Sequence, residues 1–176
     1  MKKKSLLILT MFLIMFSACS QTKIFAHKNK KTKLGNSKIH LSYLKMHRSG
    51  CFGRCPTYSI EVFENGLVRF TGIRFIADTG IFEKNFTSTK VQELLTSFEK
   101  YRVDTLKPAY ENRIVDLPGI EYLFTINNKQ THVNNAHFGP SYLRTLARNV
   151  DDFVLIEGTI RMDNSWKKVS KGSKEE

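Results

Sequence analysis

The sequence predicts an α+β domain in which an antiparallel β-sheet is covered by two amphipathic helices, in the order ββββαββα. Three observations favour this fold class. Several short segments alternate apolar and polar side chains, as half-buried strands do. Turn-forming residues separate these segments. Two later segments have an apolar period of three to four residues, which is typical of helices that cover a sheet.

The first four strands are predicted to form a meander. In the first strand the alternating apolar residues are Ile39, Leu41 and Tyr43, and in the second strand they are Tyr58, Ile60 and Val62. Asn65-Gly66 then predicts a tight hairpin, because both residues tolerate a positive φ at its centre. The return strand runs to about Phe75, and a fourth strand is expected from Ile81 to Phe86.

Two helices and a second hairpin complete the predicted fold. Thr87, Ser88 or Thr89 can cap the first helix, whose apolar face is Val91, Leu94, Leu95, Phe98 and Tyr101. A hairpin follows, with alternating residues from Ile120 to Ile126, a turn at Asn127-Asn128-Lys129 and a return strand over residues 131–135. Gly139-Pro140 opens the second helix and Gly158 ends it. Its expected buried face is Leu143, Leu146, Ala147, Val150, Phe153 and Val154.

The N-terminus has the pattern of an export signal. Three lysines precede a short apolar run, Leu6–Phe16, which is too short to span a bilayer as a permanent helix. Its end, Phe16-Ser17-Ala18-Cys19, resembles a bacterial lipobox, in which a bulky apolar residue and two small residues precede a cysteine that becomes lipidated. We therefore predict a lipoprotein signal peptide over residues 1–18 and acylation of Cys19, for example with palmitate.

The net charge of +12 is concentrated outside the predicted domain. Residues 20–48 contain eight basic and no acidic residues, whereas residues 49–160 contain twelve basic and thirteen acidic residues. We expect a basic flexible tether over 19–38, one domain over 39–158 and a polar tail over 159–176. An exported protein with this charge distribution is not expected to bind nucleic acid. The tether is either a solvated spacer or a contact for anionic headgroups.

Two cysteines remain for the folded domain. If Cys19 carries lipid, Cys51 and Cys55 form an even pair in an oxidising compartment, which favours a disulfide. A ring of this length stabilises the fold by about 2 kcal/mol in the chain-entropy treatment. The alternative keeps both thiols free for redox exchange or for metal binding.

The spacing Cys-x-x-x-Cys-Pro is also similar to the copper motif of the Sco-type chaperones of cytochrome oxidase, which use two thiolates and a distant histidine. In that interpretation Cys51 and Cys55 would bind Cu(I) together with His132 or His137. A helix follows the motif in those chaperones, whereas residues 57–63 alternate like a strand here. The disulfide is therefore the preferred interpretation, and we expect neither a metal nor another cofactor.

No hydrolase signature is present. Asp116 precedes Leu117-Pro118-Gly119 and is expected to form a turn, although an acid pair with Glu111 or Asp104 remains an alternative. The serines lack the glycine pattern of a nucleophile elbow, and no glycine-rich phosphate loop occurs. The domain is therefore not expected to be an enzyme.

The segment Cys51-Phe52-Gly53-Arg54-Cys55-Pro56-Thr57-Tyr58, followed by Asn65-Gly66, resembles a bacterial family of domains of unknown function, the family numbered 6438. Members of that family carry Cys-Phe-Gly-x-Cys-Pro-x-Tyr. The resemblance continues through Asp116-Leu117-Pro118 and extends over roughly Ile39 to Phe153. It implies an envelope or secreted domain, often lipid-anchored, and supplies no catalytic residues.

Taken together, these observations predict a lipid-anchored, non-enzymatic envelope domain that binds an envelope protein or a cell-wall partner. The residues expected to form its recognition loop are Phe52, Arg54, Tyr58 and Asp116. Ser20 and Gln21 follow the lipidated cysteine without an acidic retention residue. By resemblance to lipoprotein sorting rules, we expect the periplasmic face of the outer membrane rather than the inner membrane.

Overall fold

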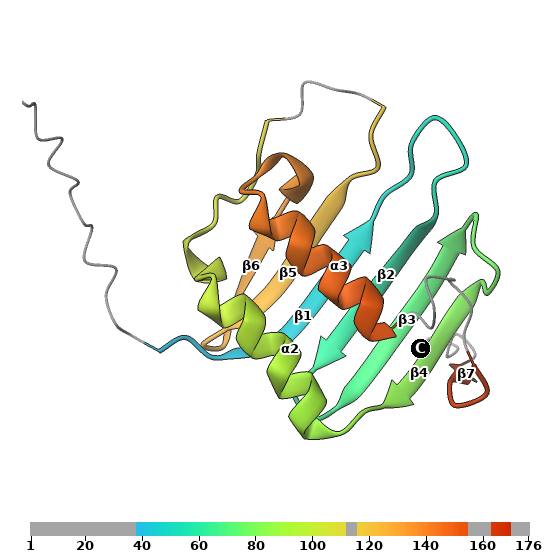
Figure 1. Cartoon of the computed structure of the whole chain (residues 1–176), viewed down its shortest axis with the longest axis horizontal. Helices are drawn as coiled ribbons and strands as arrows, with labels where there is room; N and C mark the ends of the chain where they lie inside the picture. The colour runs from blue at the N-terminus through green and yellow to red at the C-terminus, as the bar shows by residue number, and fades with distance from the viewer. Residues whose placement is uncertain (1–37, 112–115, 155–162, 170–176) are drawn as a thin grey trace, which may run out of the picture. The chain divides into compact units, whose positions relative to one another are not determined.

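An antiparallel sheet and two helices form the described part of the chain (Figure 1). The computed structural model describes residues 38–111, 116–154 and 163–169, all within the compact unit Ser37–Glu176. The strands are β1 (Leu41–Arg48), β2 (Thr57–Phe63), β3 (Leu67–Arg74), β4 (Gly80–Asn85), β5 (Ile120–Ile126), β6 (Lys129–Val133) and β7 (Lys167–Val169). The helices are α2 (Ser88–Lys100) and α3 (Tyr142–Val154), with short 3-10 turns η1 (Val103–Thr105) and η2 (Ala136–Phe138).

The predicted fold class and the order ββββαββα are confirmed. The sheet order is β6-β5-β1-β2-β3-β4-β7, so β1–β4 form the meander and the β5–β6 hairpin joins the free edge of β1. The structure adds β7, which pairs with β4 and was not predicted within the polar tail. Trp166 lies directly before β7 and is buried, with its ring 5.9 Å from that of Phe86.

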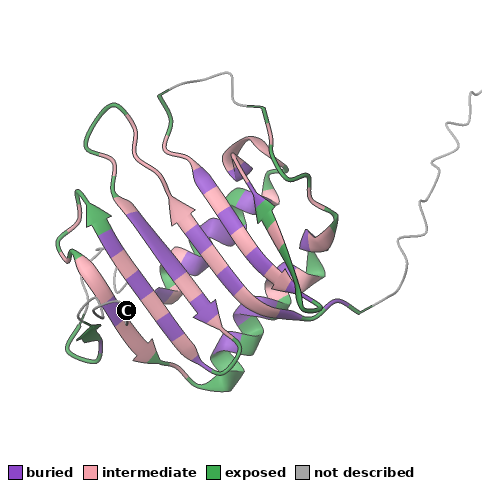
Figure 2. Cartoon of the chain, turned by 180° about the vertical axis from the view of Figure 1, so that it is seen from behind, coloured by how far each residue is buried: buried purple, intermediate pink, exposed green. Residues whose placement is uncertain are grey.

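Both helices lie across the same face of the sheet (Figure 1). Their buried side chains are Val91, Leu94, Leu95 and Phe98 from α2, and Leu143, Leu146, Ala147, Val150 and Val154 from α3. These residues confirm most of the two predicted faces, while Tyr101 is exposed and stacks on Tyr142. The other face of the sheet, which Figure 2 shows, is not covered by any element of the described residues.

A β-bulge corrects the prediction for the first strand. The pairing of β1 with β5 shifts between Leu41 and Tyr43, which reverses the alternation of inward and outward side chains. Leu44 and Met46 are therefore fully buried, whereas Tyr43 packs against Phe63 at a ring distance of 5.0 Å on the open face. The prediction that Tyr43 shares a face with Leu41 is wrong for this reason.

The first hairpin lies where it was predicted, but with a different turn. Only Gly66 of the Asn65-Gly66 pair has a positive φ, +99°, and its N–H donates to the carbonyl of Phe63 at 3.0 Å. The Asn65 side chain instead accepts from the N–H of Leu67 at 3.0 Å. This is the longer hairpin loop that ends in a left-handed residue, not the two-residue turn.

The helix boundaries are close to those predicted. Thr87 is the N-cap of α2, although its side chain makes no capping hydrogen bond. The described part of α3 ends at Val154, so the predicted stop at Gly158 lies outside the described residues, as do the signal sequence and Cys19. Among the described helices, none has the length and apolar composition that crossing a membrane would need.

The conformation of Gly66 leads to a testable prediction. A Cβ at Gly66 would lie 2.6 Å from the carbonyl oxygen of Phe86, in addition to the cost of a positive φ. We expect Gly66→Ala to lower the free energy of unfolding by roughly 1–3 kcal/mol. Gly53→Ala is the matched control, because its Cβ would meet only Cys51 Sγ at 3.7 Å. Urea denaturation of both variants checks the prediction, and equal midpoints would contradict it.

Candidate functional site

The segment that joins β1 to β2 is closed by a disulfide between Cys51 and Cys55. Their Cα atoms are 5.6 Å apart, well inside the range that a disulfide requires. The N–H of Gly53 donates to Cys51 Sγ at 3.3 Å, so the backbone folds back over the sulfur. The predicted staple is therefore present, and the cysteines are joined to each other.

Asp116 holds this disulfide loop from the neighbouring segment. Its Oδ1 accepts a hydrogen bond from the N–H of Phe52 at 2.9 Å. At the base of the two segments, the N–H of Ser49 donates to the carbonyl of Gly119 at 3.2 Å, and the N–H of Gly119 donates to Ser49 Oγ at 2.9 Å. The sequence suggested the loop and the Asp116 turn separately, and the structure brings them together.

The four predicted recognition residues have different environments. Phe52 is 85% exposed, and Arg54 and Asp116 are also exposed. Tyr58 is only 3% exposed, and its ring lies 5.7 Å from that of Phe70 within the core. Tyr58 therefore cannot contribute to the surface of the loop, because its side chain points toward the helix layer.

Tyr58 instead belongs to a polar cluster beneath α3 that the sequence analysis missed. Its hydroxyl donates to Asp151 Oδ1 at 2.7 Å, and Arg48 Nε donates to the same oxygen at 3.3 Å. A second guanidinium nitrogen of Arg48 contacts Asp151 Oδ2. Arg48 is the last residue of β1 and lies opposite Tyr58 in the β1–β2 register. One carboxylate therefore ties two strands to α3.

Burial and charge both act on this cluster. Burial alone lowers the pKa of the Arg48 guanidinium, but the hydrogen bond and the charge of Asp151 outweigh burial and raise that pKa. Burial, followed by the charge of Asp151, raises the pKa of the Tyr58 hydroxyl. Arg48 therefore stays charged and Tyr58 stays protonated as a donor.

One sequence signal could have identified Asp151. The residue follows Ala147 by four positions and precedes Val154 by three, so it lies along the apolar stripe of α3. An acid in that position is expected to need a buried partner. The sequence does not say which basic residue supplies it, because Arg48 lies 103 positions away.

The geometry does not support a copper site. Among the described residues, which include all four candidate ligands, no group of three or more His, Cys, Asp or Glu could hold a metal ion. His132 lies on β6, with Nε2 4.0 Å from Glu121 Oε2. His137 lies in η2, where burial and the charges of Arg144 and Arg48 lower its pKa.

Of the three carboxylates in the hydrolase alternative, Asp104 and Asp116 have separate structural partners. Asp104 lies in η1 and binds Arg102, which holds the pKa of the Asp104 carboxyl below its usual range. Asp116 accepts the Phe52 N–H instead. Their observed roles are to stabilise two different turns.

The open face of the sheet carries a ladder of paired charges. Lys45, Glu61, Arg69 and Glu83 lie in one row across β1, β2, β3 and β4. Glu61 contacts Lys45 at 2.8 Å and Arg69 at 3.2 Å, and Arg69 contacts Glu83 at 2.7 Å. Each of these charges has a partner of the opposite sign, as cross-strand pairs that stabilise a sheet do.

A shallow cavity of about 310 Å³ lies beside this ladder. It is lined by Lys45, His47, Ser59, Glu121, Tyr122, Leu123 and His132. His47 Nδ1 and Ser59 Oγ are 2.9 Å apart, but Ser59 is buried and lies on a strand without a nucleophile elbow. The contact is a cross-strand hydrogen bond and does not supply the oxyanion site that acyl transfer requires.

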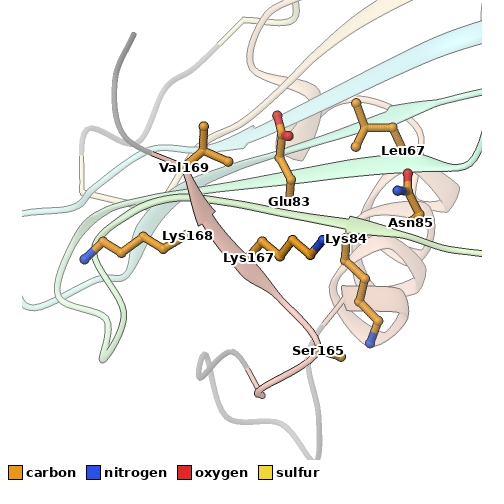
Figure 3. Close-up of a pocket in the computed structure, with 8 residues that line it drawn as sticks. All are labelled: Leu67, Glu83, Lys84, Asn85, Ser165, Lys167, Lys168 and Val169. Atoms are coloured by element: carbon orange, nitrogen blue, oxygen red, sulfur yellow. The ribbon is translucent and has the colours of Figure 1, made fainter.

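A second cavity, of about 420 Å³, lies at the β4–β7 edge (Figure 3). Three lysines line it, yet in Figure 3 the Lys168 side chain points away from those of Lys84 and Lys167. The amino group of Lys84 lies over the rings of Phe86 and Trp166, at 5.0 and 5.8 Å from their centres. The three ammonium groups therefore do not converge on one anion.

The role of Asp151 leads to a second prediction. Asp151→Ala leaves the largely buried Arg48 without its carboxylate and is expected to destabilise the domain by roughly 3 kcal/mol. Tyr58→Phe removes one hydrogen bond to a charged group, with an expected cost of about 1.5 kcal/mol. Asp152→Ala, the exposed neighbour on α3, should change stability by less than about 0.5 kcal/mol. Denaturant unfolding separates these cases, and equal effects at Asp151 and Asp152 would disprove the role of the cluster.

Comparison with known proteins identifies a family and no characterised relative. No curated protein and no solved structure shows significant similarity to the chain. The family model of a domain of unknown function, DUF6438, matches residues 42–154. This range contains the disulfide loop, the Asp116 turn and the Arg48–Tyr58–Asp151 cluster. Because the match covers more than half of the sequence, the chain belongs to the DUF6438 family.

Proposed function

We propose that this chain is a lipid-anchored binding module of the cell envelope, attached through Cys19 and not an enzyme. Its recognition surface includes the disulfide loop between β1 and β2. The proposal on the anchor rests on the signal pattern that ends at Cys19 and on the basic segment that follows it. Ser20 and Gln21, which follow Cys19, do not form an acidic retention signal, and this favours the periplasmic face of the outer membrane.

The observation that carries the binding proposal is the exposure of Phe52. An aromatic side chain with 85% of its area in contact with solvent gains nothing from the hydrophobic core. The same residue is held at both sides, by the Cys51–Cys55 bond and by Asp116. A loop that is already ordered before binding loses less conformational entropy when the partner binds, so this arrangement suits recognition.

Intact-mass analysis of protein extracted from membranes tests the anchor. We expect the full chain to be cleaved before Cys19 and to carry the mass of several acyl chains, because one chain binds a membrane only marginally. Cys19→Ser is the control and should lose all acyl mass. Alkylation before and after reduction should label Cys51 and Cys55 only in the reduced sample. An acyl-free wild-type protein would refute the anchor.

Photo-crosslinking tests the recognition loop independently. A benzophenone amino acid in place of Phe52 is expected to give a defined adduct in intact cells, because this side chain would contact the partner. Tyr101, which is 44% exposed on the end of α2, is the matched control position. Adducts of equal yield at both positions, or none at residue 52, would contradict recognition by this loop.

A further inference from the structure

Three loops lie at the same end of the sheet (Figure 1). They join β1 to β2, join β3 to β4, and lead into β5. Four of the exposed large apolar side chains occur there: Phe52 at 85%, Ile73 at 50%, Phe75 at 44% and Leu117 at 39% exposure. We call these four residues, with Arg54 and Arg74, the loop tip. The described chain begins at Lys38, next to the start of β1, which lies at the opposite end of the sheet.

The backbone of Phe75 adopts an unfavourable conformation while its ring is exposed to solvent. Its φ of +57° lies in the left-handed region, which bulky residues rarely adopt. The ring is exposed and therefore does not recover this cost through burial in the core. The guanidinium carbon of Arg74 lies 4.9 Å from the ring centre, so a cation and an aromatic ring are presented together.

The two arginines of the loop tip have no carboxylate partner among the described residues. Arg54 is exposed in the disulfide loop, and Arg74 is exposed at the end of β3 with its guanidinium beside the Phe75 ring and Gly50. A Cβ at Gly50 would lie 2.9 Å from Arg74 Nη2, so the glycine makes room for this guanidinium. The Asp116 carboxylate, on the neighbouring segment, accepts the Phe52 N–H.

The chemistry of this surface favours a membrane over a protein partner. Its four apolar side chains expose roughly 400 Å² in total, taking about 200 Å² for a whole large side chain. That is close to the apolar share of the ~800 Å² that each partner contributes to a standard protein interface, so area alone does not choose between a protein and a membrane. Apolar loop apices beside unpaired guanidiniums match the interfacial layer of an anionic bilayer, where phosphates lie above acyl chains.

We propose that the loop tip binds the headgroup layer of an anionic phospholipid bilayer as a second membrane contact. Phe52 and Phe75 enter the apolar boundary, and Arg54 and Arg74 bind lipid phosphates. This inference rests on the proposed function, since the acylated Cys19 would hold the domain beside that bilayer. The residues between Cys19 and Lys38 can span at most about 70 Å. That reach exceeds the ~27 Å length of an eight-residue strand such as β1, so the tip can turn back to the same membrane.

Vesicle binding of the unlipidated mature chain tests the proposal. The chain carries Cys19→Ser and keeps the tether and the tail, and the vesicles contain phosphatidylethanolamine and phosphatidylglycerol in a 3:1 ratio, a composition we choose as roughly that of an anionic bacterial surface. We expect Phe52→Ala/Phe75→Ala to reduce the partition coefficient at least about tenfold. Arg54→Gln/Arg74→Gln should reduce it roughly fivefold per arginine, and this loss should disappear on phosphatidylcholine vesicles.

Tyr101→Ala is the matched control, because Tyr101 is as exposed as Phe75 but lies outside the loop tip. All variants must retain the wild-type melting transition, which excludes unfolding as the cause of a loss. Unchanged vesicle binding by both double variants, or a crosslink from residue 52 to protein alone, overturns the proposal. If Cys19 is acylated but vesicle binding does not depend on the loop tip, the lipid anchor is supported and the loop-tip proposal is refuted. If vesicle binding depends on the loop tip but Cys19 is not acylated, the loop-tip contact is supported and the anchor is refuted.

Discussion

The shared carboxylate of Asp151 is the constraint on which the arrangement of this domain depends. It accepts from Arg48 at the end of β1 and from Tyr58 near the start of β2. A buried ion pair contributes little stability by comparison with apolar packing, but breaking one leaves an uncompensated charge that costs several kcal/mol. The position of α3 on the sheet is therefore restricted to one in which Asp151 lies over both partners.

The same cluster fixes the base of the disulfide loop. Arg48 and Tyr58 are paired across β1 and β2, and the loop begins after one and ends before the other. Arg48 is also paired with Ile120, so the segment that carries Asp116 starts from a fixed position beside it. The sheet register fixes the base of the loop, the disulfide closes it, and the Asp116–Phe52 hydrogen bond holds its apex. Phe52 is exposed on a loop with little freedom to withdraw.

Local patterns were sufficient to predict most of the fold, because alternation and helical period follow directly from which side chains are buried. These patterns gave wrong predictions where the same local sequence is compatible with more than one backbone conformation. A β-bulge reversed the face of Tyr43, and Asn65-Gly66 formed a longer loop than the pair alone suggests. β7 has only three residues, all of them exposed, and so has no alternation to detect.

The candidate site was only partly predictable for a related reason. The cysteine spacing and the Asp116 turn are visible in the sequence, whereas the bond between Asp116 and Phe52 spans 64 positions. Tyr58 was expected to belong to the recognition loop because it lies close to the disulfide in the sequence. Its side chain is buried and serves the cluster with Asp151. Ile73, Phe75 and Leu117 join the loop tip only because sheet topology places three loops at one end.

The distribution of paired and unpaired charge distinguishes the two accessible surfaces of the sheet. On the open face, Lys45, Glu61, Arg69 and Glu83 already neutralise one another, so a charged partner there must first compete with existing ion pairs. At the loop tip, Arg54 has no carboxylate partner among the described residues. Net charge on the chain is high, but the folded part is close to neutral. Attraction to an anionic surface therefore depends on where the unpaired cations lie, and at the loop tip the Arg74 guanidinium lies over the exposed ring of Phe75.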